Sequence, residues 1–131
     1  AVHYVGHLPD ETAIAELYRL SDLAVSVPSS DGMPLSVLEA MACGTALVLS
    51  DIPALREWIQ DEREGLFVPP GDVQALGGAV LRLLEDESLR RELAGSGVDL
   101  AKERASREGW MRRYEEIYEH LIQAQQGLAG A

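Results

Sequence analysis

Cysteine, positive charge and long apolar runs are all scarce in this chain. Its 131 residues include a single cysteine, Cys43, which excludes a disulfide framework and fits a cytoplasmic compartment. No apolar run approaches the roughly 20 residues of a membrane span, and no N-terminal signal pattern is present. Lysine and arginine total 11 against 22 acidic residues, so the formal net charge is −11. This balance argues against nonspecific nucleic-acid binding, which needs a basic face.

Short apolar runs alternate with helical patterns along the whole sequence. The length is enough for one domain with a real core, and the hydrophobic fraction of 47% is ordinary for a globular protein. Strands alternating with helices indicate a parallel sheet with right-handed crossovers. We therefore expect a single α/β domain over residues 1–131, a Rossmann-like parallel sheet of about four strands with flanking helices. The expected strands are 2–5, 23–27, 46–49 and 66–68.

Apolar residues at helical spacing and capping residues place the expected helices. The first helix starts at Asp10, the second at Pro34, and the third spans 53–60. The fourth starts at Asp72, a break at 85–88 separates it from the fifth, and the sixth spans 106–123. The pair Gly77-Gly78 weakens the helix that contains it, and we expect it to allow a close approach of neighbouring backbone. The aromatic and aliphatic side chains from Trp110 onward fit either the core or a docking stripe, and we expect the core.

The stretch 29–44 carries the strongest functional signal, because it joins the strand at 23–27 to a helix through a sharp loop. Asp31-Gly32 marks a turn, and Pro34 can open a helix because the first helical N–H has no partner within the helix. Gly44 is the expected residue just beyond the helix end. In an open parallel sheet such a loop lies at the carboxyl end of a strand, where ligands bind.

Two carboxylates flank the start of this helix, Asp31 in the loop and Glu39 about one turn into the helix. The free N–H groups around 35–37 and the helix dipole suit an anion such as a phosphate. Ionised carboxylates repel a phosphate but accept strongly from neutral hydroxyls. A nucleotide-sugar has this layout of sugar, diphosphate and ribose. Taken singly, each carboxylate also has a structural interpretation, Asp31 as a turn residue and Glu39 as an exposed helix residue.

Residues 31–44, followed by 46–51, resemble the E-x7-E signature of the retaining GT-B glycosyltransferases. This family includes glycogen-synthase-like and phosphatidylinositol-mannosyltransferase-like enzymes, and its signature lies in the C-terminal, donor-binding domain. The segments 65–72 and 110–118 also resemble the family. The chain departs from the pattern at three positions. Asp31 replaces the first Glu, Pro34 stands where Gly is commoner and removes one N–H, and Ala46 stands where Pro is frequent.

The resemblance implies a donor-binding half that lacks the N-terminal acceptor domain of its parent enzyme. That parent would transfer a sugar from a nucleoside diphosphate sugar, with retention, to a saccharide, lipid or small-molecule acceptor. The resemblance implies no metal and no other cofactor. The implied contacts are Asp31, Gly32 and Met33 to the donor sugar, Leu35 and Ser36 to the diphosphate, Glu39 to the ribose, and Leu8 to the base. It assigns no catalytic residue.

The expected parent is a cytoplasmic hexosyltransferase-type enzyme, held at the inner membrane, if at all, through the absent domain. We expect the isolated chain to be inactive and to have no nucleic-acid partner and no transmembrane segment. Two alternatives remain open. One is a nucleotide-sugar-binding module without transfer activity. The other is an α/β interaction domain, in which the acidic surface and the helix over 110–118 bind a partner.

Overall fold

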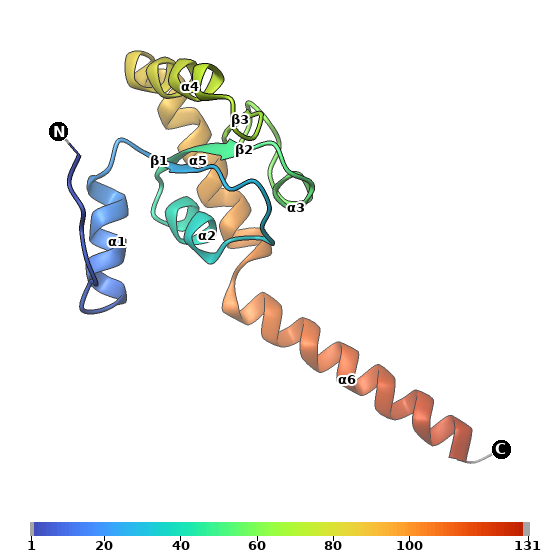
Figure 1. The fold of residues 1–131 in the computed structure, drawn as a ribbon. Coiled ribbons are helices and arrows are strands. Elements are labelled where there is room, and N and C mark those ends of the chain that lie inside the picture. The colour runs from blue at the N-terminus through green and yellow to red at the C-terminus, as the bar shows by residue number, and fades with distance from the viewer. Residues whose placement is uncertain (1, 130–131) are drawn as a thin grey trace.

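A computed structural model describes residues 2–129 and contains a three-stranded parallel sheet flanked by helices (Figure 1). The strands β1 (Leu23–Ser26), β2 (Ala46–Ser50) and β3 (Leu66–Val68) lie side by side in that order. Val25 is in register with Val48, and Val48 with Leu66. The expected α/β architecture with a parallel sheet is confirmed.

Every expected helix is present. Their bounds are α1 Glu11–Leu20, α2 Leu35–Ala42, α3 Pro53–Arg56, α4 Val73–Glu85, α5 Glu87–Arg104 and α6 Arg107–Ala129. Aspartate side chains cap three of them, because Asp10, Asp72 and Asp86 each accept a hydrogen bond of 2.9 Å from a backbone N–H three residues on. Helix α3 is shorter than the expected 53–60, and α6 extends past 123.

The expected strand at 2–5 is wrong. These residues pair with no strand in the described part of the chain, and Val2 and Tyr4 are 101% and 96% exposed. A strand needs a neighbour to accept its ladder of hydrogen bonds, and the described part of the chain brings none to this segment. The sheet therefore has three strands among residues 2–129, where four were expected.

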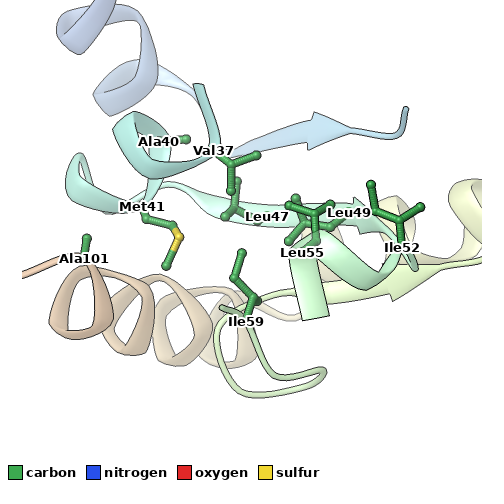
Figure 2. Close-up of a cluster of buried hydrophobic side chains, with 9 residues drawn as sticks. All are labelled: Val37, Ala40, Met41, Leu47, Leu49, Ile52, Leu55, Ile59 and Ala101. Atoms are coloured by element: carbon green, nitrogen blue, oxygen red, sulfur yellow. The ribbon is translucent and has the colours of Figure 1, made fainter. Parts of the chain in front are cut away.

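The central strand β2 divides the core between the two faces of the sheet. Leu47 and Leu49 belong to a cluster that α2, α3 and α5 cover, whereas Ala46 and Val48 belong to a second cluster on the opposite face. This alternation follows from the two-residue period of a strand, and burial of all five β2 residues is typical of a parallel sheet. Figure 2 shows the first cluster. It comprises Val37, Ala40, Met41, Leu47, Leu49, Ile52, Leu55, Ile59 and Ala101.

The backbone requires glycine at Gly44 and Gly71, where φ is positive, and at Gly65, where another strand lies close, but not at the pair 77–78. Gly44 ends α2 at a φ of +75°, and the N–H groups of Gly44 and Thr45 donate to Met41 and Ala40 at 3.0 Å, which is the Schellman arrangement. A Cβ on Gly65 would lie 3.2 Å from the Leu47 carbonyl oxygen. No backbone in the described part of the chain approaches the pair at 77–78, where an added Cβ would meet nothing within 4 Å, so the expected close approach is wrong.

The apolar side chains of α6 do not enter the core, so the expectation that the residues from Trp110 onward are core residues is wrong. Helix α6 extends away from the sheet (Figure 1), and its main described packing is the stacking of Trp110 on Trp58, with ring centroids 6.4 Å apart. Helical spacing gathers the apolar residues on one face, but no described element covers that face. We call it the α6 stripe. It consists of Trp110, Met111, Tyr114, Ile117, Tyr118, Leu121 and Ile122, which are 41–65% exposed.

Candidate functional site

The loop from 27 to 34 leaves the carboxyl end of β1 and leads directly into α2. In a parallel sheet, this end of the strands is where crossover loops form ligand sites. Helix α2 then packs its buried face, Val37, Ala40 and Met41, against the sheet. This packing fixes the direction of the helix, and hence of its N-terminus, relative to the loop.

The N-terminus of α2 presents two backbone donors to solvent. Pro34 is the N-cap residue, with extended φ and ψ and no side-chain hydrogen bond to the helix. The first hydrogen bonds to its carbonyl come from Val37 at 3.1 Å and Leu38 at 3.4 Å. The N–H groups of Leu35 and Ser36 precede these bonds and have no hydrogen-bond acceptor among residues 2–129, and both residues are exposed. This arrangement is suited to an anion.

The loop residues predicted to contact a sugar are accessible but differ in their packing. Asp31 and Gly32 are exposed, and Asp31 Oδ1 accepts a hydrogen bond of 2.8 Å from the Gly32 N–H. Met33 is half-buried, and its side chain packs against the core cluster. A ligand in the loop would therefore meet the backbone of this residue. The loop thus presents one carboxylate, of which one oxygen is already bonded within the loop.

Glu39 is half-buried and lies between two cavities. The smaller, about 210 Å³, lies between α1 and α2, and the larger, about 370 Å³, lies between α2 and the end of α5. Tyr18 lines the smaller cavity, and its pKa is raised by burial and then by the nearby Glu39 and Cys43. Leu8, predicted to contact a base, lies in the irregular segment before α1 and borders neither cavity.

The larger cavity also includes a cation that sequence reasoning missed. Lys102, the one lysine of the chain, lines it together with Leu35 and Glu39. It lies on α5, and its approach to α2 depends on how these two helices pack. The available sequence signal was that a lone lysine lies next to the apolar residues of α5, such as Ala101, which is 7% exposed.

A second polar cluster, at the carboxyl end of β2, is structural. Arg56 forms two hydrogen bonds with Asp51, at 2.7 and 3.0 Å, and its guanidinium lies 4.2 Å from the centre of the Phe67 ring. The bond from Arg56 lowers the pKa of Asp51. Asp61 Oδ1 accepts from the Phe67 N–H at 2.9 Å. These contacts fasten α3 to β3, and every carboxylate in them already has a partner.

Neither a metal centre nor a membrane span is present in the described part of the chain. Among residues 2–129, no group of three or more His, Cys, Asp and Glu side chains is arranged to hold a metal ion. None of the helices described there combines the length and the apolar composition needed to cross a bilayer.

Comparison with known proteins identifies relatives in sequence and one solved structure with a similar fold. An N,N′-diacetylbacillosaminyl-diphospho-undecaprenol α-1,3-N-acetylgalactosaminyltransferase of Campylobacter jejuni is 36% identical over 122 residues, 93% of this chain and 31% of that protein. A phosphatidyl-myo-inositol mannosyltransferase of Mycolicibacterium smegmatis is 31% identical over 123 residues, 88% of this chain and 31% of that protein. A sucrose-phosphate synthase structure from Thermosynechococcus elongatus superposes with a TM-score of 0.87 and 30% identity, over 93% of this chain and 30% of that one.

The chain therefore spans less than a third of the length of these relatives. Residues 1–97 match the model of one family, described as glycosyl transferases group 1. This match covers the strands, the loop and α2, and so includes Asp31, Leu35, Ser36 and Glu39, whereas Lys102 and the other α5 residues that line the larger cavity lie beyond it. The chain belongs to the group 1 glycosyltransferase family.

Proposed function

We propose that this chain is the donor-binding half of a retaining glycosyltransferase, whose donor is a nucleoside diphosphate sugar. The observation that carries the proposal is the pair of open N–H groups at Leu35 and Ser36, with Asp31 before them and Glu39 after them. The diphosphate would accept from the two N–H groups at the positive end of the α2 dipole. Glu39 would accept from the ribose hydroxyls and Asp31 from the sugar.

In this proposal the loop gives the site its direction. The backbone of Gly32 and Met33 lines the sugar and the distal phosphate, so the sugar lies on the β1 side of the diphosphate. The ribose lies on the other side, one turn along α2, and the base extends from it toward Leu8. In this proposal no metal ion is needed, because the positive end of the α2 dipole offsets part of the charge of the diphosphate. Chelation of divalent cations should therefore leave nucleotide binding unchanged.

The direct test of this arrangement is a titration of the chain with a nucleoside diphosphate by calorimetry, for wild type and Glu39→Gln. Loss of a charge-assisted hydrogen bond is worth about 1.5–3 kcal/mol, so we expect affinity to fall about tenfold to a hundredfold. Glu92→Gln, an exposed position on α5, removes the same charge away from the site and should leave affinity unchanged. Equal affinity for Glu39→Gln and wild type would contradict the proposal.

Transfer itself is proposed for a longer parent enzyme, since the relatives are about three times as long as this chain. Its N-terminal domain would hold the acceptor, a saccharide, lipid or small molecule. The chain alone should bind donor weakly, because an exposed helix-dipole interaction contributes only about 0.3–1 kcal/mol and the net charge is −11. Micromolar or tighter binding, or any sugar transfer by the chain alone, would contradict the proposal that donor binding and transfer need the rest of the parent enzyme.

The α6 stripe favours a second candidate function, that of an α/β interaction domain. An exposed apolar face of this extent on one helix marks a protein contact. This candidate predicts that Tyr118→Glu weakens association with a partner protein, whereas Asp31→Ala and Glu39→Ala change the affinity of no small ligand. Loss of nucleotide affinity in the two site variants would rule it out as the sole function.

A further inference from the structure

The groove between α2 and α5 follows α2 from its first residue to its last. Leu35 and Ala42 both line this 370 Å³ cavity, facing residues from Val98 to Ser106. A Cβ on Gly97 would lie 3.7 Å from Met41, and one on Gly44 would lie 3.6 Å from Val98. Helix α5 thus passes the end of α2 at residues 97–98 and continues toward its beginning. The groove therefore connects the N-terminus of α2 to Glu39, and its volume is in the range of small-molecule sites.

Most of the lining is apolar, and its charged side chains are Glu39 and Lys102. No ion pair within 4.0 Å joins these two among the described residues, so neither charge is neutralised by the other. Between residues 7 and 56 the sequence has one basic residue, Arg19, on α1, and it lines none of the cavities at α2. Lys102 is thus the cation that the fold, rather than the local sequence, brings to this part of α2.

We propose that Lys102 contacts the phosphate that adjoins the ribose of a bound nucleoside diphosphate. The inference rests on the proposed function, since it takes the ribose at Glu39 and the diphosphate at Leu35 and Ser36 as its starting point. A phosphate lying between Leu35 and Glu39 would lie along this groove, and Lys102 lines the groove from the facing helix. An ammonium on a flexible four-carbon stem suits a phosphate as a point charge. It would also offset the repulsion that Asp31 and Glu39 exert on the ligand.

The alternative is that Lys102 is a solvated surface charge that contacts no ligand. The two alternatives differ for ligands with and without phosphate. A phosphate contact affects a nucleoside diphosphate and not the matching nucleoside, whereas a surface charge affects neither. The phosphate contact also predicts that nucleotide binding depends less on salt concentration once the lysine is removed, because one pair of opposite charges is lost.

The test is calorimetric titration of the whole chain with uridine diphosphate and guanosine diphosphate, and with the matching nucleosides. Lys102→Gln should lower the affinity for the nucleoside diphosphate about three- to tenfold at low salt, as expected for an exposed charge contact. The affinity for the nucleoside should stay unchanged. Lys102→Arg should retain most of the affinity. Arg91→Gln is the matched control, because it removes the same charge from α5 at an exposed position outside the groove.

The outcomes separate this inference from the proposed function. If wild type binds neither diphosphate, both are overturned. If wild type binds and Glu39→Gln weakens binding, but Lys102→Gln matches Arg91→Gln, only the role of Lys102 is overturned. Equal loss of nucleoside and nucleoside diphosphate in Lys102→Gln would also overturn it. Unfolding midpoints of the variants, measured beside the titrations, identify any loss that comes from misfolding, and Lys102→Arg then decides the question.

Discussion

The carboxylate of Asp31 accepts a hydrogen bond from the backbone N–H of Gly32, with 2.8 Å between Oδ1 and N. Asp31 therefore has two possible roles, holding the loop and binding a sugar. Asp31→Asn keeps an oxygen for Gly32 but loses the charge, whereas Asp31→Ala loses both. If Asp31 contacts the sugar, we predict that both variants lower the affinity for a nucleoside diphosphate sugar. The affinity for the free nucleoside diphosphate should stay nearly unchanged, as measured by calorimetry.

A loop-holding role gives a different pattern for the same variants. Asp31→Ala would then lower the affinity for both ligands equally, because the loop would lose its geometry near Pro34 and the α2 N-terminus. Asp31→Asn would bind both ligands like wild type. That pattern would contradict the assignment of Asp31 to the sugar.

Glycine substitutions should act with opposite sign at two helices. Gly78→Ala in α4 meets nothing within 4 Å, so we predict a gain of about 0.5–1 kcal/mol in the free energy of unfolding. Gly44→Ala forces alanine into a φ of +75° and should cost about 1–2 kcal/mol. Urea denaturation measures both. A loss of stability in Gly78→Ala would contradict the open surroundings of this position.

Two buried hydroxyls at opposite ends of β2 provide a matched pair. Ser50 Oγ is fully buried and has no hydrogen-bond partner within residues 2–129, whereas Thr45 Oγ1 donates to the Tyr18 carbonyl at 2.8 Å. We predict that Ser50→Ala is neutral or stabilising, because an unpaired buried polar atom is removed. Thr45→Val should cost about 0.5–1.5 kcal/mol of unfolding free energy. A cost at Ser50 equal to that at Thr45 would contradict this difference between the two hydroxyls.

Acid should weaken the attachment of α3 through Asp51. The hydrogen bond from Arg56 lowers the pKa of Asp51 from its ordinary value of 3.8, so the native state favours the charged form. The resulting stability is present above that value and is lost as the pH falls through the lowered pKa. The difference in unfolding midpoint between wild type and Asp51→Asn should be constant from about pH 5 to 7 and shrink below about pH 4. A difference that is independent of pH would contradict this. Both side chains are half-exposed, so the effect is small.

Local patterns predicted the parts of the fold whose causes are local. Apolar runs identified β1, β2 and β3, and the glycine at 44 and the aspartate at 72 marked where helices end and begin. The loop before α2 could be placed at a strand end for the same reason. The roles assigned to Asp31, Glu39, Leu35, Ser36 and the other site residues stay predictions.

Features that depend on distant parts of the chain could not be read from the sequence. The segment 2–5 has strand-like residues, but a strand forms only where a neighbour pairs with it. The periodicity of α6 showed which face is apolar but not what covers it. Lys102 comes to α2 only because α5 packs along that helix, and no local motif encodes that contact.

The central claim is that an anion binds at the N-terminus of α2. Amide chemical shifts of the isotopically labelled chain, recorded while a nucleoside diphosphate is added, test it most directly. The account predicts that the largest changes fall on the N–H groups of Leu35 and Ser36, with smaller ones at Glu39 and along the groove to Lys102. Saturating nucleotide that leaves the Leu35 and Ser36 signals in place, or that shifts a different surface such as α4, would contradict it.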